Sequence, residues 1–235
     1  MNSEGLIKKD SQLFFLFIKN YWMYYLGLEE QFLSTQRYVA FESLNFKTYS
    51  SEYLRLLESI CSEIDVVGKV IANQINSNFN IFESSGTIYK WWFIIQDWYH
   101  KKHMEPISMV ELFDVPFSPW SSFQIEEFKD MKGARRFRRI NNKDELSWWT
   151  AYNKVKHCRA LEDSVTKQKY YIRANLGNVC NAITALYLLE KAYMQDVGTN
   201  QDNSNRRKSE LFEHNNIRMY ENKVTNTIAI ENLMD

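Results

Sequence analysis

The chain has 235 residues, and Lys plus Arg number 29, as do Asp plus Glu, so its formal net charge is zero. This balance excludes binding of nucleic acid through bulk positive charge and leaves only local basic clusters for that role. Hydrophobic residues make up 45% of the chain and aromatic residues 15%, with only 7 glycines and 3 prolines. The composition favours one domain of long helices over a turn-rich β-sandwich.

The three cysteines, Cys61, Cys158 and Cys180, are widely spaced and form no CxxC pair. This pattern is typical of reduced thiols in a cytoplasmic protein, and we predict no metal site and no cofactor. The apolar run at 13–18 follows two lysines but is short and lacks a small-residue cleavage site. We therefore expect a buried first helix, with neither export nor membrane insertion.

Apolar residues recur at helical spacing through most of the chain, which predicts five main helices. Four of them are expected over about 10–41, 87–102, 142–161 and 166–196, and the second begins near residue 50 and has apolar positions as far as Ile75. Ser50 or Ser51 is the expected N-cap of the second helix. Asn142 and Glu145 have the spacing of a capping box at the start of the fourth helix. All three prolines fall within 104–146, which predicts an irregular insertion or long loop there.

After Gly198 the stretch GTNQDNSNRRKSE is polar and rich in helix-breaking residues, so it predicts a mobile linker. The final segment is predicted to be a short hairpin or a docking tail. The expected fold is therefore all-α, with a single helical domain over 1–197 and a linker and C-terminal tail over 198–235.

The stretch WWTAYNKVKHCR, at 148–159, falls on the fourth predicted helix. Asn153 and His157 are separated by four positions and share one helix face, as do Tyr152 and Lys156. A histidine in such a polar setting can act as a general acid or base near neutral pH. The alternative is a satisfied, partly buried histidine among aromatic residues that belong to the core.

Together with SEIDVVGK upstream and ANLGNVCNAITALYLLEK downstream, this stretch resembles HEPN domains, the all-helical domains of many prokaryotic defence and toxin ribonucleases. The family motif is an arginine, a polar residue that is often asparagine, three variable residues and a histidine. Asn153 and His157 match its polar residue and its histidine, whereas Tyr152 stands at the arginine position. Many members also carry an acidic residue four positions before a basic one on an earlier helix, as Asp65 and Lys69 do.

The resemblance implies a HEPN-like bundle over about 10–196 and metal-independent cleavage of RNA, in which the ribose 2′-OH attacks the phosphodiester. His157 would then transfer protons, and the arginine of the family would support the phosphate charge. Tyrosine brings no positive charge, so cationic help must come from elsewhere and catalysis is expected to be weakened or altered. Members of the family bring two motifs together at a dimer interface, which implies a homodimer. The candidate catalytic residues are His157, Asn153, Tyr152, Asp65, Lys69, Lys156 and Arg159.

A basic segment, KDMKGARRFRRINNK at 129–143, lies directly before the motif helix. Its clustered cations around an aromatic residue predict RNA-phosphate binding by Arg135, Arg136, Arg138 and Arg139. The alternative is a solvated basic loop, or one paired with acidic residues such as those in QIEEF at 124–128.

Two functions remain open from the sequence. The first is a cytoplasmic, homodimeric HEPN-type endoribonuclease that acts on RNA in phage defence, or in a toxin-antitoxin or stress response, with an antitoxin or defence-system protein as a candidate partner. The second is a catalytically impaired module of the same fold that binds RNA, nucleotide or a protein. A solvent-exposed His157 with Asn153, Lys69 and a dimer mate nearby would favour the enzyme, and burial of His157 beneath Trp148 and Trp149 would favour the module.

Overall fold

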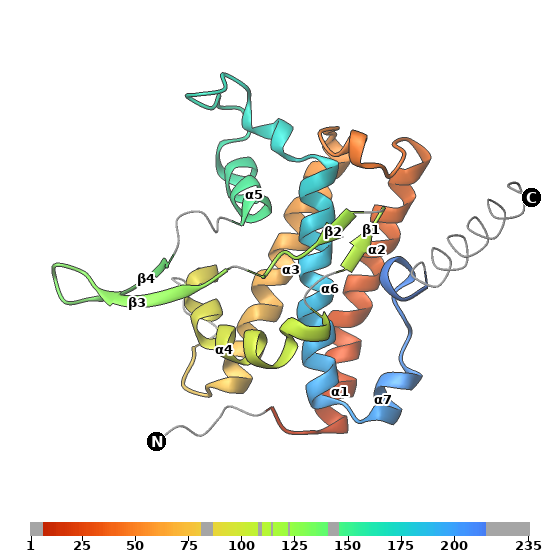
Figure 1. Ribbon diagram of the computed structural model, residues 1–235, viewed down its shortest axis with the longest axis vertical. Coiled ribbons are helices and arrows are strands. Elements are labelled where there is room, and N and C mark those ends of the chain that lie inside the picture. The colour runs from red at the N-terminus through yellow and green to blue at the C-terminus, as the bar shows by residue number, and fades with distance from the viewer. Residues whose placement is uncertain are drawn as a thin grey trace, which may run out of the picture.

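The computed structural model describes residues 7–80, 87–107, 110–113, 115–121, 123–140 and 146–214. The fold is mostly helical, and α3 and α6 pack side by side at its centre (Figure 1). The remaining long helix, α4, packs against α3. These three helices are α3 (Ser51–Ile75), α4 (Ile88–Ile107) and α6 (Leu176–Val197).

The first predicted helix is interrupted and ends earlier than expected. It consists of α1 (Ser11–Phe17), a π-helical turn (Ile18–Trp22) and α2 (Met23–Ser34). At its end the Thr35 hydroxyl donates to the Phe32 carbonyl at 2.7 Å, and the chain passes into a single 3₁₀ turn over Thr35–Arg37. The predicted extension to residue 41 is therefore wrong.

The second predicted helix is confirmed. The Ser50 side chain accepts a hydrogen bond from the Tyr53 backbone at 3.0 Å and so caps the first turn of α3. A periodic stripe of apolar side chains along α3 is fully buried, as the spacing predicted. That stripe includes Leu57, Ile60, Ile64, Val67 and Ile71.

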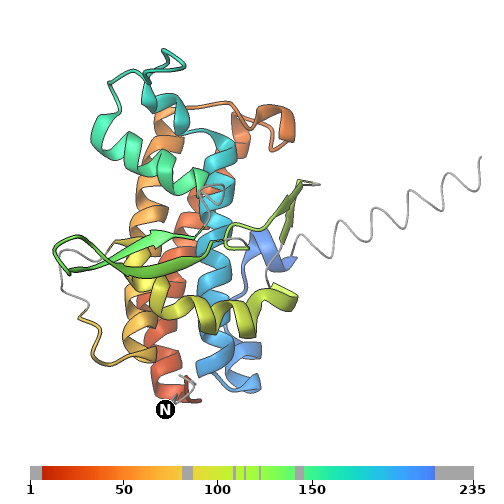
Figure 2. The same ribbon diagram turned by 60° about the vertical axis from the view of Figure 1, so that its left-hand side comes forward.

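The predicted insertion contains strands, so the all-α expectation is wrong in this segment. Two antiparallel hairpins are present, β1 (Val110–Leu112) with β2 (Val115–Phe117), and β3 (Ile125–Lys129) with β4 (Arg135–Arg139). The second turn has a clear sequence basis, since Gly133 adopts a φ of 76° and Asp130 accepts from the backbone of Lys132 and Ala134. Figure 2 shows this hairpin extending away from the helices.

Trp120 anchors the insertion in the helical core. It is only 1% exposed, its ring stacks on Trp92 with centroids 4.4 Å apart, and its Nε1 donates to the Ala185 carbonyl of α6 at 3.0 Å. Trp148 of α5 meets the same ring edge-on at 5.4 Å. The segment that contains the prolines is therefore anchored to the helical core by Trp120 and is not a free loop.

The fourth helix, α5 (Ser147–Cys158), is shorter than predicted. Leu146 occupies the N-cap position without a side-chain hydrogen bond, and the predicted capping box of Asn142 and Glu145 lies outside the described residues. The predicted fifth helix begins later, at α6, where the Asn175 side chain accepts from the Asn178 backbone. Between α5 and α6 lies the short 3₁₀ helix η4 (Tyr170–Arg173).

The polar stretch after Gly198, predicted to be a mobile linker, is folded over its described part. It forms α7 (Asn200–Asn205) and the π-helical turn η5 (Glu210–His214). The buried Glu29 carboxylate of α2 accepts from the Ser209 hydroxyl and from the Glu210 backbone at 2.9 Å, which fixes this segment to the helices. The predicted terminal hairpin or docking tail lies beyond the described residues.

Candidate functional site

The motif helix α5 is clearly two-sided. Trp148, Ala151, Tyr152 and Val155 are buried against the rest of the fold. Successive helical residues are rotated by about 100°, which places His157 roughly opposite this buried face. His157 is exposed and is not buried beneath Trp148 and Trp149, and it shares its helix face with the half-buried Asn153.

Tyr152, at the position of the family's arginine, belongs to the core. Only 6% of it is exposed, and its ring packs against Trp149 with centroids 5.1 Å apart. Lys156 Nζ donates to the phenolic oxygen at 3.0 Å and lies 5.2 Å from the centre of the same ring. This hydrogen bond raises the pKa of Lys156, and the carboxylates of Asp65 and Glu58 on α3 add smaller contributions in the same direction.

Asp65 and Lys69 form a half-buried ion pair on α3. Lys69 Nζ lies 2.5 Å from one Asp65 oxygen, and the indole Nε1 of Trp91 donates to the other at 2.9 Å. Because both oxygens already accept hydrogen bonds within the fold, this pair helps to attach α4 to α3.

Arg159 lies at the C-terminal end of α5, 4.0 Å from the Glu58 carboxylate of α3. Its side chain is 56% exposed, so this ion pair is a loose surface contact. Arg159 therefore has donors available for a ligand.

The structure thus brings together five of the seven candidate catalytic residues and leaves the other two apart. The group along the contact between α3 and α5 consists of Asp65, Lys69, Tyr152, Lys156 and Arg159. Within the described parts of the chain, neither Asn153 nor His157 has a hydrogen bond or ion pair with this group. The packing of α5 is the reason, since its buried face turns His157 toward solvent.

The chain has no significant match among protein-family models, curated proteins or solved structures. The site must therefore be judged on its own geometry.

The described residues contain no group of three or more His, Cys, Asp or Glu side chains placed to hold a metal ion. None of the helices in the described ranges is both long and apolar enough to cross a membrane.

The predicted RNA-binding arginines lie on β4 of the projecting hairpin, and three of them are paired with acidic residues. Arg135 donates from Nε and Nη2 to the two carboxylate oxygens of Glu127, each at 2.6 Å. Arg138 donates to Glu126 at 2.7 Å, and Arg136 donates to the turn residue Asp130 at 3.0 Å. Glu126 and Glu127 belong to QIEEF, so the sequence alternative of pairing with that segment is present in the fold.

Arg139 differs from the other three arginines of the hairpin. Its Nη1 is buried and has no hydrogen-bond partner within the described part of the protein. A buried guanidinium nitrogen is poorly placed to reach an RNA phosphate, so Arg139 is the weakest of the four candidates.

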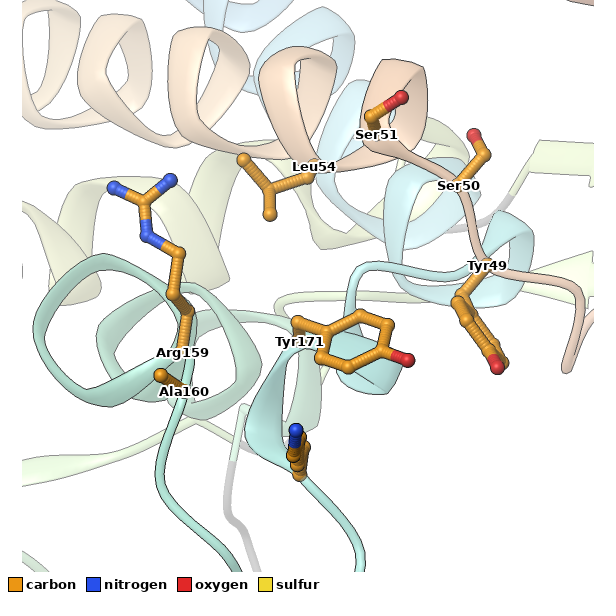
Figure 3. Close-up of a pocket in the computed structure, with 8 residues that line it drawn as sticks. Tyr49, Ser50, Ser51, Leu54, Arg159, Ala160 and Tyr171 are labelled. Carbon is orange, nitrogen blue, oxygen red and sulfur yellow. The ribbon is translucent and has the colours of Figure 1, made fainter.

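Sequence reasoning missed a pocket of about 420 Å³ beside the end of α5 (Figure 3). Sequence analysis identifies Arg159 as a candidate catalytic residue, but it does not identify Tyr49, Lys169 or Tyr171. The signal in the sequence is faint, because these residues are far apart along the chain and lie in short connecting segments. Tyr49 precedes α3, whereas Lys169 and Tyr171 lie between α5 and α6.

Sequence analysis also missed two glutamates with raised pKa values, the fully buried Glu190 and the half-buried Glu63. Glu190 of α6 is 0% exposed, and neither of its carboxylate oxygens has a hydrogen-bond partner among the described residues. Burial raises its pKa well above the usual value, and the charge of Glu63 on α3 adds to the effect. Their sequence signal is a carboxylate within an otherwise apolar helix stripe, as in LYLLEKAY.

Proposed function

We propose that this protein is a HEPN-type endoribonuclease that cleaves RNA without a metal ion, with His157 as its proton-transfer group. The observation that carries the proposal is the exposure of His157 on the outer face of α5, next to Asn153. An exposed imidazole can approach a flexible RNA strand and exchange protons near neutral pH.

In this reaction the ribose 2′-OH attacks the phosphorus atom while the bond from phosphorus to the 5′ oxygen breaks. His157 either removes the proton of the 2′-OH or donates a proton to the leaving 5′ oxygen, and the products are a cyclic phosphate and a 5′-hydroxyl. Asn153 would orient the strand by hydrogen bonding. Tyr152 has no place in this step, because it is buried and bonded to Lys156.

The charge on the reacting phosphate would need a cation from elsewhere. Lys154 is exposed on the same helix, and a second copy of the chain could supply another cation. We therefore include the homodimer in the proposal, with two copies of His157 near a two-fold axis. The aromatic residues of α5 do not drive this contact, since Trp148 is buried and Trp149 is half-buried. Phage defence or a toxin-antitoxin or stress response remains the proposed setting.

A second function is favoured by the burial of Tyr152. If the cation that the family places there has been replaced by a core residue, the domain can retain its fold and bind RNA, nucleotide or a protein without cleaving RNA. The two functions differ in one measurable property, which is cleavage that depends on His157.

Incubation of the purified protein with total RNA in EDTA tests the proposal. We expect cleavage by the unaltered protein, loss of cleavage in His157→Ala, and unchanged cleavage in Gln74→Ala, which alters an exposed residue of α3. Equal cleavage by the protein and by His157→Ala would overturn it. Stable binding of RNA with no cleavage by any of the three would establish the binding module instead.

A further inference from the structure

The pocket beside the end of α5 joins the start of α3, at 49–54, to the segment that follows α5, at 159–171. Figure 3 shows Tyr49, Ser50, Ser51 and Leu54 on the α3 side, facing Arg159 and Tyr171 across the opening. Ala160 and Lys169 complete the lining. A volume of about 420 Å³ is within the range of sites that hold small molecules, roughly 300–1,000 Å³.

Backbone hydrogen bonds fix the walls of this pocket. Tyr49 forms an antiparallel bridge with Asn175, and the Leu176 backbone donates to the Thr48 carbonyl at 2.9 Å. On the opposite wall, the Tyr171 backbone donates to the Arg159 carbonyl at 3.1 Å. The pocket is therefore formed before any ligand arrives, which lowers the entropic cost of binding.

The lining combines aromatic rings with positive charge. The rings of Tyr49 and Tyr171 lie edge to face with centroids 5.3 Å apart, and Leu54 extends the apolar surface. Lys169 is exposed and has no ion pair with any other residue in the described ranges, while Arg159 has only the loose contact with Glu58. A purely apolar ligand would leave both cations unused, and a bare inorganic anion would leave both rings unused.

We propose that this pocket binds a nucleoside phosphate, with the base against the ring of Tyr171 and the phosphate between Arg159 and Lys169. Base stacking on an aromatic side chain and ion pairing with guanidinium and ammonium groups are the interactions that such a ligand requires. The ligand is either a free mononucleotide or the phosphorylated end of an RNA strand, because both present the same chemistry. The inference does not depend on RNA cleavage, since His157 does not line the pocket.

Calorimetric titration with AMP, adenosine and inorganic phosphate tests the inference. We expect AMP to bind more tightly than either of its parts. Arg159→Gln and Lys169→Gln should each weaken AMP binding by about 10- to 100-fold, since each removes a charge-assisted contact. Tyr171→Ala should weaken binding of AMP but not of inorganic phosphate. Lys167→Gln is the matched control, because it removes the same charge two positions from Lys169 at a residue outside the pocket.

Short RNAs with and without a 5′-phosphate identify the source of the ligand. Tighter binding of the 5′-phosphorylated RNA than of AMP, with loss in Lys169→Gln, would assign the pocket to an RNA end, and equal binding would assign it to free nucleotides. Failure of AMP and of both RNAs to bind, or binding unchanged by all three pocket substitutions in folded protein, would overturn the inference. AMP should still bind to His157→Ala. Nucleotide binding in the pocket can then be judged independently of whether the protein cleaves RNA.

Discussion

The indole of Trp91 on α4 lies directly against the backbone of Gly68 on α3. A Cβ atom added to Gly68 would come within 2.6 Å of the six-membered ring of Trp91, a distance that real side chains do not tolerate. The same indole donates to Asp65 one turn earlier, and Asp65 also pairs with Lys69. The acidic and basic residues that match the HEPN pattern are thus part of a tight contact between two helices.

Gly68→Ala should destabilise the protein by about 1–3 kcal/mol, because the ring of Trp91 is fully buried and has no free space to move into. Gly27→Ala on α2 is the control, since an added Cβ there meets nothing within 4 Å. That substitution should stabilise the protein by roughly 0.5–1 kcal/mol through helix propensity. Urea unfolding measures both changes, and equal stability of the two variants would contradict the close contact.

Tyr152→Arg should destabilise the fold by about 2–4 kcal/mol, because it places a charged group in the buried face of α5. Tyr152→Phe keeps the ring and removes only the hydrogen bond from Lys156, which should cost about 1 kcal/mol or less. Thermal and urea unfolding give the comparison. An arginine variant as stable as the unaltered protein, with increased RNA cleavage that His157→Ala abolishes, would show that Tyr152 occupies the motif position in function as well as in sequence.

Local signals made some elements predictable from the sequence. The Ser50 cap and the apolar stripe of α3 act over a few residues, so the start of that helix and its buried face were predicted correctly. The hairpin of β3 and β4 was missed because its stability depends on pairs between strands, such as Arg135 with Glu127. In the sequence of β4 alone, the four arginines appear only as a basic cluster, because the acidic partners of three of them lie on β3 and in the turn.

The candidate site was predictable in the same limited sense. The spacing of Asn153 and His157 places them on one face of a helix, whatever surrounds that helix. Their separation from Asp65 and Lys69 depends on which face of α5 packs inward, and that is decided by contacts such as Trp148 with Trp120. A pocket assembled from residues more than a hundred positions apart, such as Tyr49 and Arg159, leaves no pattern in the sequence.

Stability should fall as the pH rises from 5.5 to 8, because the buried Glu190 and the half-buried Glu63 favour their protonated forms in the folded state. Burial raises the pKa of Glu63 to about 7, and burial together with Glu63 raises that of Glu190 well above its usual value. The folded pKa values exceed the unfolded ones, so the contribution of these two groups to the unfolding free energy is fully present below about pH 4.5 and is lost as pH rises through the folded values. Unfolding in urea at pH 5.5 and pH 8 should show lower stability at pH 8.

Glu190→Gln isolates this effect, since the amide resembles the protonated carboxyl group in shape. It should raise stability at pH 8 by about 1–3 kcal/mol and by less at pH 5.5. Glu52→Gln is the control, because the hydrogen bond from Arg55 lowers the pKa of Glu52 and its removal should bring no gain at pH 8. A Glu190→Gln variant that loses stability equally at both pH values would mean that the carboxyl group does not titrate as the burial requires.

The hairpin arginines give the last prediction. Their ion pairs with Glu126, Glu127 and Asp130 involve arginine side chains that are 61–68% exposed, and such surface pairs contribute only about 0–1 kcal/mol each. RNA phosphates can therefore displace the carboxylates. If they do, joint replacement of Arg135, Arg136, Arg138 and Arg139 by glutamine should weaken RNA binding and flatten its salt dependence, since fewer counterions are released.

Removing the competing acids should have the opposite effect on the same measurement. Glu126→Gln with Glu127→Gln frees Arg138 and Arg135 and should strengthen RNA binding, followed by fluorescence anisotropy across a salt series. Arg55→Gln, which breaks an exposed ion pair on α3 away from the hairpin, should leave both the affinity and the slope unchanged. The salt dependence of RNA binding could instead be the same in the arginine variant, the glutamate variant and Arg55→Gln. That result would assign the arginines to pairing within the hairpin, because a phosphate-binding surface must respond to a change in its own charge.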